Sequence, residues 1–337
     1  AAIPDPKVNI LFVVDNSGSM DGHQATLKAN IAKFADTFFK NPRLDYKIGV
    51  VPVYDSTYLD GQAHCRLKTD VRKMNKFAEL VPLKNADGSV MAESVPFITR
   101  DTANAEEVLK QTVALGTQCG PEAEESFSPV LGVIDPQINQ TKNSNFYDKD
   151  AFLVVIFLTD ADDISPGLNA GQFYEKLVAA KGGDRSKVLI AAALPDKERP
   201  GCTVDSVGPQ FADLISISNG SRFNLCSNSF GTELVTFGNV LVEKVAQQRI
   251  ELDFIPDTRL KITYGKKGMR DEEMQTIEPN VDGGYTYLPG TKTIILQANL
   301  NINRIEGGEI FITAYPIDPK NFKNGRATTI GQTKPKK

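Results

Sequence analysis

The chain has 337 residues, of which 41% are hydrophobic and 24% are charged. This is the composition of a globular protein with a core, which excludes a disordered or fibrous chain. The length suits one large domain with a small one, or two domains of medium size. Lysine and arginine number 38 against 42 aspartates and glutamates, a net charge of −4. Without a basic excess, the chain is not expected to bind nucleic acid.

Apolar runs are too short for a membrane span. The longest, Ala151–Leu158, fits a buried strand and falls well below the roughly 18 residues that cross a bilayer. The sequence opens on Ala1–Pro6, which is typical of a mature or trimmed product. We therefore expect a removed export signal, and any membrane attachment would come from a lipid anchor upstream of Ala1.

Strand and helix patterns alternate through residues 1–248. Continuous apolar runs at Val8–Val14 and Phe152–Thr159 predict strands that are covered on both faces. Apolar residues at helical spacing predict a helix over His23–Phe39. Further strands are expected at 46–53, 188–194 and 222–225, and further helices at 104–115, 121–134, 171–181, 210–218 and 232–248. This alternation predicts a doubly wound α/β domain with a mostly parallel sheet.

The pattern changes after Gln248. Short strand-like segments separated by Gly- and Asp-rich turns follow at 250–254, 259–264, 285–288, 293–300 and 309–315, with one short helix at 271–275. This predicts a small, sandwich-like all-β domain over residues 249–316. The remaining residues, 317–337, are expected to form a polar tail.

Three polar loops are expected at the edge of the α/β sheet where ligands bind, beyond the carboxyl ends of its strands. The first strand runs into Asp15, Ser17 and Ser19, and the strand at 152–158 runs into Asp160. Between them, Thr117 lies in a turn before a helix. Carboxylates and hydroxyls without an imidazole suit Mg²⁺, Mn²⁺ or Ca²⁺ and not zinc or copper.

The spacing Asp15-x-Ser17-x-Ser19 after an apolar strand resembles the metal-ion-dependent adhesion site of von Willebrand factor type A domains, which integrin inserted domains share. Thr117 and Asp160 match the threonine and the aspartate of its second and third loops. The resemblance covers about residues 8–248. It implies that the hydroxyls bind the cation, that the aspartates hold it partly through water, and that one position stays open for a partner's acidic oxygen.

Each of these residues also has a simpler interpretation. Asp15 alone could be a turn residue, and Ser17 and Ser19 could cap the helix that follows. Two more residues are candidates for an additional metal-site role. Glu122 could supply an oxygen ligand to the metal, or it could only interact with the dipole of the helix that it begins. Asp162 could influence the metal site, or it could only be a charged residue that keeps its loop in contact with solvent.

The four cysteines are Cys65, Cys119, Cys202 and Cys226. They contain no CxxC pair, which argues against a zinc site. Three pairings are open, and chain order favours Cys65 with Cys119 and Cys202 with Cys226. The run 116–122 and the late cysteine pair also resemble exported bacterial members of the family. The resemblance implies two disulfides and an oxidising location, whether periplasmic, cell-surface or secreted.

We therefore expect an extracytoplasmic adhesion or binding protein, and not an enzyme. It would hold Mg²⁺, or Mn²⁺ or Ca²⁺, and engage a protein or surface polymer with an accessible carboxylate. One alternative is a metal-dependent enzyme that hydrolyses phosphoryl groups or esters. However, the sequence around Ser17 is not a Gly-x-Ser-x-Gly elbow, and the chain has only 2 histidines to act as a general base. The other alternative is an intracellular scaffold subunit with the same fold.

Overall fold

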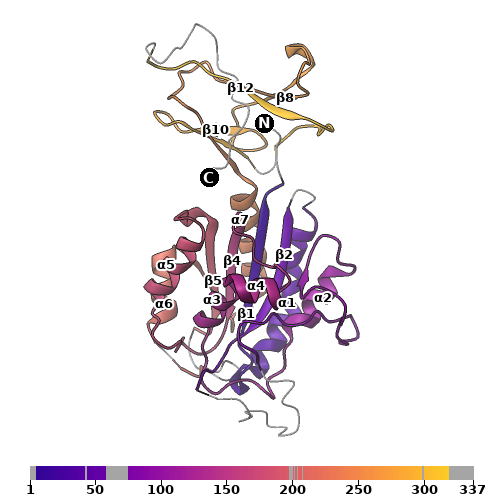
Figure 1. Cartoon of the computed structure of the whole chain (residues 1–337), viewed down its shortest axis with the longest axis vertical. Helices are drawn as coiled ribbons and strands as arrows, with labels where there is room; N and C mark the ends of the chain where they lie inside the picture. The colour runs from indigo at the N-terminus through magenta and orange to yellow at the C-terminus, as the bar shows by residue number, and fades with distance from the viewer. Residues whose placement is uncertain are drawn as a thin grey trace. The chain divides into compact units, whose positions relative to one another are not determined.

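The computed structural model describes residues 5–318, except 42–43, 58–74, 197–199, 201, 203, 207 and 298–299. The chain divides into two compact units (Figure 1). The first, Lys7–Val240, is called the α/β unit below. The second, called the β unit, contains the described residues before Lys7 and after Val240.

The α/β unit is built on a sheet with the strand order β3-β2-β1-β4-β5-β6. Its strands are β1 (Lys7–Val14), β2 (Asp45–Pro52), β3 (Phe97–Ile98), β4 (Phe152–Leu158), β5 (Val188–Leu194) and β6 (Ser221–Asn224). Neighbouring strands are parallel except for β3, which runs antiparallel to β2. The chain moves outward from β1 through β2 and then returns to β4 on the other side of β1. The direction of winding therefore reverses between β1 and β4, which is where such sheets bind ligands.

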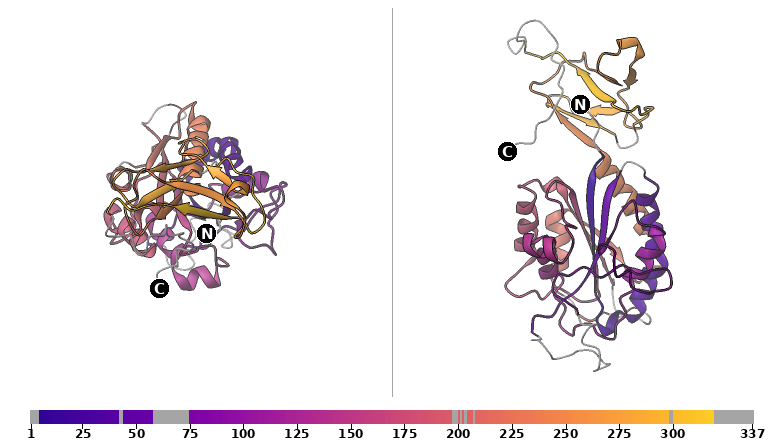
Figure 2. Two further views of the ribbon diagram at one scale, coloured as in Figure 1. Left: turned by 90° about the horizontal axis from the view of Figure 1, so that it is seen from above. Right: turned by 45° about the vertical axis from the view of Figure 1, so that its right-hand side comes forward.

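Helices cover both faces of this sheet (Figure 2). They are α1 (Asp21–Phe39), α2 (Ala105–Val113), α3 (Phe127–Ile134), α4 (Pro136–Thr141), α5 (Ala170–Ala180), α6 (Gln210–Ser218) and α7 (Phe230–Ala246), with short 3₁₀ turns η1 (Gly18–Met20) and η3 (Arg185–Lys187). This double cover explains why β1 is buried at every position after its first residue.

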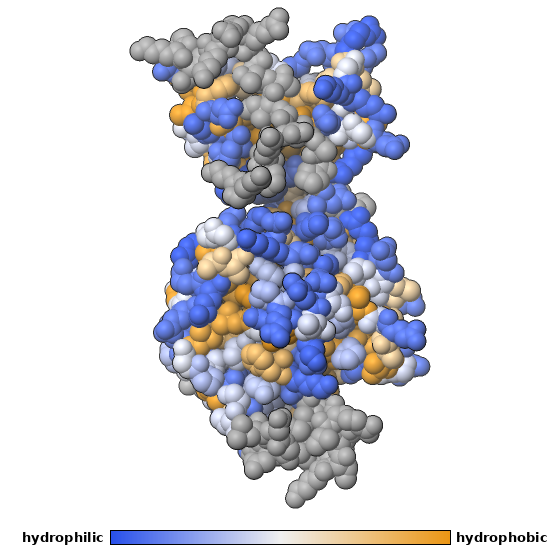
Figure 3. Space-filling model, viewed as in Figure 1, coloured by the Kyte–Doolittle hydropathy of each residue, from blue (hydrophilic) through white to orange (hydrophobic). Residues whose placement is uncertain are grey.

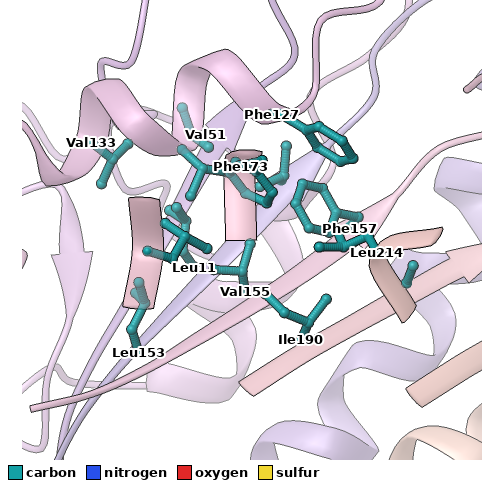
Figure 4. Packing of buried hydrophobic residues seen from close by; sticks show 14 of the residues in the cluster. Leu11, Val51, Phe127, Val133, Leu153, Val155, Phe157, Phe173, Ile190 and Leu214 are labelled. Carbon is teal, nitrogen blue, oxygen red and sulfur yellow. The ribbon is translucent and has the colours of Figure 1, made fainter. Parts of the chain in front are cut away.

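Aromatic side chains form much of the core on each face. On one face, Phe127 of α3 stacks on Phe173 of α5 with ring centroids 4.5 Å apart, and Phe157 of β4 lies beside both (Figure 4). On the other, Phe34 of α1 contacts Phe12 of β1 edge-on at 5.6 Å. Phe34 also stacks at 6.1 Å on Phe237 of α7. The sheet is thus fixed between two packed layers, which holds the ends of its strands in place.

The β unit contains two three-stranded antiparallel sheets, with the orders β10-β11-β7 and β12-β8-β9. Its elements are β7 (Gln248–Glu251), β8 (Lys261–Gly265), η4 (Asp271–Glu273), β9 (Gln275–Ile277), β10 (Tyr285–Tyr287), β11 (Thr293–Leu296) and β12 (Glu309–Thr313). Both sheets contribute to one hydrophobic cluster, which includes the fully buried Ile262 of β8 and Ile294 of β11. A shared core of this kind makes the unit a small sandwich.

The doubly wound, mostly parallel α/β architecture predicted from the sequence is confirmed, as is a following set of antiparallel sheets. The predicted helix at 121–134 is wrong in its first half, because α3 begins only at Phe127. Ahead of it, Glu125 exchanges two backbone hydrogen bonds with Tyr54, of 2.8 and 3.0 Å. This tertiary pairing holds the backbone extended and outweighs the local preference for helix. The predicted polar tail lies almost wholly outside the described residues.

Across the described ranges, no helix combines the length and apolar character needed to traverse a bilayer. On the face of the α/β unit shown in Figure 3, hydrophobic residues occur in small groups among hydrophilic ones. Scattered apolar surface of this kind is normal for folded proteins.

Candidate metal centre

The first loop of the site leaves β1, at the lower edge of the sheet in Figure 1, and enters α1 through η1. Asp15, the first residue after β1, is fully buried. Its Oδ1 accepts a hydrogen bond of 2.8 Å from the Ser17 backbone N–H, and its Oδ2 accepts one of 2.7 Å from the Thr159 hydroxyl. Both carboxylate oxygens are therefore fixed by groups from two different loops.

A chain of close oxygen atoms links the first loop to the loop that follows β4. Ser17 Oγ lies 3.0 Å from Ser19 Oγ, and the Ser19 hydroxyl donates to Asp160 Oδ1 at 2.9 Å. Asp160 is buried and follows β4, the direct neighbour of β1. The structure thus brings Asp15, Ser17, Ser19 and Asp160 together at one edge of the sheet, as predicted from their positions at the ends of adjacent strands.

The spacing of these oxygens fits a small hard cation. Ligand oxygens at ~2.1 Å from Mg²⁺ in an octahedron lie roughly 2.9 Å apart along each edge. The Ser17–Ser19 and Ser19–Asp160 separations of 3.0 and 2.9 Å match that length. Across the residues that the structure describes, no three histidine, cysteine or acidic side chains are arranged as a group that could hold a metal. A cation at this edge therefore depends on the serine hydroxyls as well as on the aspartates.

Thr117 occupies a different position from the other four predicted ligands. Its hydroxyl donates to Asp21 Oδ1, at the first turn of α1, over 2.6 Å. Its neighbour Gly116 is tied to the first loop through the buried side chain of Gln24. Gln24 Nε2 donates to the Asp15 carbonyl at 3.0 Å and to the Gly116 carbonyl at 3.3 Å, while Gln24 Oε1 accepts from the Gly116 N–H at 2.9 Å. Gln24 therefore holds the second loop against the first and places Thr117 beside the helix that follows Ser19.

The two additional candidates lie in different environments. Glu122 is exposed. Asp162 accepts hydrogen bonds from the backbone N–H groups of Gln210 and Phe211, both at 3.1 Å. These amides belong to the first turn of α6, so Asp162 caps that helix from a distant part of the chain.

Glu124 is a site residue that sequence reasoning missed. It is only 6% exposed, and the Ser17 side chain hydrogen-bonds to it. Burial raises the pKa of Glu124 to about 8, helped by repulsion from Asp15, Asp205 and Asp160. The expected helix hid this residue, because Glu122 was then the acid nearest the helix start. The chain bends at residues 122–123 and then pairs with Tyr54 at Glu125, so Glu122 is exposed on the bend and Glu124 is buried beside the paired residue.

Burial also acts on Asp15. It raises the pKa of Asp15 to about 6, although hydrogen bonds from Ser17 and Thr159 oppose the shift. Nearby, His23 of α1 is buried with Nε2 4.0 Å from Asp160 Oδ2. Buried carboxylates whose charged forms are disfavoured by desolvation gain stability from a cation placed among them. The donor chemistry therefore fits a divalent metal of the Mg²⁺, Mn²⁺ or Ca²⁺ type.

Disulfide bonds anchor the loops around the site. The predicted Cys202–Cys226 bridge is confirmed. It fixes the segment that carries Asp205, whose backbone N–H donates to the Asp160 carbonyl at 2.9 Å. Cys119 is also disulfide-bonded, whereas its predicted partner Cys65 lies outside the described residues.

The strand order, the reversal of winding between β1 and β4, and the Asp-x-Ser-x-Ser loop at that reversal together decide the fold. The α/β unit has the von Willebrand factor A fold. No model of a protein family matches the chain, and no curated protein matches it by sequence.

Several solved structures of von Willebrand factor A proteins are similar to the chain. Proximal thread matrix protein 1 from the mussel byssus is 14% identical with a TM-score of 0.43, covering 74% of this chain and 51% of its own. A second structure of that protein is described with zinc in its MIDAS motif, that is, its metal-ion-dependent adhesion site. The pilus adhesin SpaC from Lactobacillus rhamnosus GG is 10% identical with a TM-score of 0.41, covering 93% of this chain and 39% of its own. The VWA domain of SpRpn10 is 11% identical with a TM-score of 0.37, covering 69% of this chain and 95% of its own.

The chain spans about half the length of the mussel protein it resembles. The assignment of the fold rests on the strand order and the loops described above.

Proposed function

We propose that this chain is an extracytoplasmic binding protein that engages an acidic group of a protein or surface polymer through a divalent cation. Asp15, Ser17, Ser19, Thr117 and Asp160 would hold the cation, with Mg²⁺ as the expected ion and Mn²⁺ or Ca²⁺ as alternatives. The observation that carries this proposal is the run of close oxygens from Ser17 through Ser19 to Asp160, beside the buried Asp15.

The ligand set explains why such a site would bind a guest instead of only storing a metal. Serine and threonine hydroxyls are neutral, so they leave much of the charge of the cation uncompensated. A bound cation supplies an electrophilic position for an acidic oxygen. The chain's own contribution is to keep the donors fixed: Thr159 orients Asp15, and Gln24 joins the first and second loops.

The disulfides support a location outside the reducing cytosol. The Cys202–Cys226 bridge and the bonded Cys119 are expected to persist in an oxidising compartment. Mass spectrometry of the protein from its native cells, under non-reducing conditions with thiols alkylated, tests this. Four alkylated cysteines would favour the intracellular scaffold alternative.

Metal binding and guest binding can be tested on the same variants. Metal-free protein is titrated with Mg²⁺ and Mn²⁺ by calorimetry, and its metal-dependent retention on a polyglutamate-coated surface is then measured. Asp15→Ala should abolish both. Asp45→Ala removes an exposed aspartate at the amino end of β2, the opposite edge of the sheet, and should change neither.

Two results would contradict the proposal. The first is wild-type metal affinity in Asp15→Ala, or retention on polyglutamate that does not depend on metal. The second is turnover of a generic phosphatase or esterase substrate that Ser17→Ala abolishes, which would favour the enzyme alternative.

A further inference from the structure

The second loop of the site is attached to helix α1 through two side chains that lie one above the other. Asp21 and Gln24 are three positions apart on α1, so they share a face of the helix. Gln24 holds the backbone of the loop: it donates to the Gly116 carbonyl at 3.3 Å and accepts from the Gly116 N–H at 2.9 Å. Asp21 holds the side chain of the next residue, because the Thr117 hydroxyl donates to its Oδ1 over 2.6 Å. The position of Thr117 is therefore set by α1.

The bond between Thr117 and Asp21 is stronger than an ordinary surface contact. Asp21 is an exposed acid in the first turn of α1, where a negative charge interacts favourably with the helix dipole. That interaction does not require a hydroxyl from another loop, yet the Asp21 carboxylate accepts one. A separation of 2.6 Å is typical of a hydrogen bond from a hydroxyl to a carboxylate, which is roughly twice as strong as one between neutral groups. The bond therefore fixes the Thr117 hydroxyl in addition to any effect on the helix.

The direction of this bond decides what the Thr117 oxygen can do. A hydroxyl has one proton to donate and two lone pairs that can accept a hydrogen bond or bind a metal. Because the Thr117 proton is directed to Asp21, the lone pairs of Thr117 Oγ1 remain available. Ser19 shows the same arrangement, since its hydroxyl donates to Asp160 Oδ1 at 2.9 Å. In both residues a carboxylate takes the proton and leaves the oxygen as an acceptor.

We propose that Asp21 is a positioning residue of the metal centre, which holds the Thr117 hydroxyl with its lone pairs available to the cation and does not bind the cation itself. This inference rests on the proposed function, in which Thr117 is a ligand. A group that accepts the proton of a metal ligand fixes the orientation of that ligand and makes it a better donor to the metal. Helix α1 thus contributes to the site beyond the Asp-x-Ser-x-Ser loop that precedes it.

The experiment is a double-mutant cycle with Mn²⁺ as the probe. Full-length wild type, Asp21→Ala, Thr117→Val and the double variant are titrated with Mn²⁺, and free Mn²⁺ is measured by electron paramagnetic resonance. The relaxation of water protons then reports how many water molecules each bound Mn²⁺ carries. Asp36→Ala is the matched control, because Asp36 is another aspartate of α1, lies toward the end of that helix and pairs with Lys40.

Asp21→Ala should weaken Mn²⁺ binding by roughly tenfold, the lower end of the losses seen when the partner of a metal ligand is replaced. Relaxation per bound Mn²⁺ should increase, since water takes the position that Thr117 leaves. Thr117→Val should lose at least as much affinity and show a similar increase. In the Thr117→Val background, Asp21→Ala should weaken binding by no more than roughly twofold and should not change relaxation, because the hydroxyl that Asp21 positions is already absent. Asp36→Ala should behave as wild type.

Wild-type affinity and relaxation in Asp21→Ala would overturn the inference. An equal loss of affinity in both backgrounds would also overturn it, and would leave Asp21 as a remote charge or a helix-dipole residue. Wild-type values in Thr117→Val would overturn it as well, because Thr117 would then not be a ligand. Each of these results is compatible with a cation held by the other proposed ligands, whereas a wild type that binds no Mn²⁺ would overturn the proposed function itself. Asp21 is exposed and Thr117 is not fully buried, so all the variants should fold.

Discussion

The backbone of Gly120 packs directly against the backbone of Asn16. A methyl group at Gly120 would lie 1.7 Å from the Asn16 carbonyl oxygen and 2.6 Å from the Ser17 nitrogen. Both distances are far below van der Waals contact, and neither neighbour is a flexible side chain. The second loop of the site therefore rests on the peptide that carries Ser17, and only glycine permits this approach.

The first prediction follows from this contact. Gly120→Ala should push the first loop away from its position, which separates Ser17 from Ser19 and lowers metal affinity by at least roughly tenfold. Calorimetry with Mg²⁺ measures the loss. Gly22→Ala is the matched control, because nothing lies within 4 Å of a methyl group there. In the helix α1, that control should leave metal affinity unchanged and stabilise the protein by up to about 1 kcal/mol. Equal metal affinity in both variants would contradict the prediction.

A second prediction concerns pH. The pKa of Glu124 rises from 4.5 to about 8, and that of Asp15 from 3.8 to about 6, in each case first because of burial. The folded metal-free protein therefore keeps protons that the unfolded chain has already released. For each group, the free energy of unfolding should fall as the pH rises from the pKa of the unfolded chain to the raised pKa of the folded protein.

Urea denaturation in the presence of a chelator, at about pH 5.5 and about pH 8, measures this fall. Glu124→Gln removes the larger of the two shifts and should flatten the dependence. Added Mg²⁺ should stabilise the protein more at the higher pH, because the carboxylates are then ionised and ready to bind it. A stability that rises with pH in the metal-free wild type would refute the expectation.

The sequence was informative where burial and periodicity are strong. The runs at Val8–Val14 and Phe152–Leu158 are apolar at nearly every position, which is typical of a strand in a parallel sheet covered on both faces. Their adjacency then brought Asp15 and Asp160 together. By contrast, the sequence does not predict β9. This strand has three residues, two of them polar, and is too short to show the alternation of apolar and polar residues that marks a strand.

The parts of the site that the sequence did not show depend on contacts between distant segments. The identity of Glu124 as the buried acid depends on the pairing of Glu125 with Tyr54, 71 positions earlier in the chain. The bond from Thr117 to Asp21 likewise joins residues 96 positions apart. Local pattern carries no information about such contacts, which is why the motif could be predicted and its surroundings could not.

A third prediction concerns the Cys202–Cys226 bridge, which closes a loop with a sequence separation of 24. Loop-closure entropy gives such a bridge a stabilising effect of about 3.5 kcal/mol. The same loop supplies the Asp205 N–H that donates to the Asp160 carbonyl. Replacing both cysteines by serine should therefore lower the free energy of unfolding and also weaken Mg²⁺ binding. Chemical denaturation and calorimetry on the double variant check the two effects, and unchanged values for both would show that the bridge is dispensable.

The last prediction separates the two interpretations of Asp162. Its carboxylate oxygens accept from the N–H groups of Gln210 and Phe211 at the start of α6. Both oxygens are thus engaged in capping, which leaves them poorly placed to bind a metal. Asp162→Ala should lower the free energy of unfolding by about 1 kcal/mol, the usual cost of losing a cap. Mg²⁺ affinity should stay at the wild-type level, whereas Asp160→Ala should abolish it. If Asp162→Ala instead loses metal affinity with little change in stability, Asp162 belongs to the metal centre and capping is its secondary role.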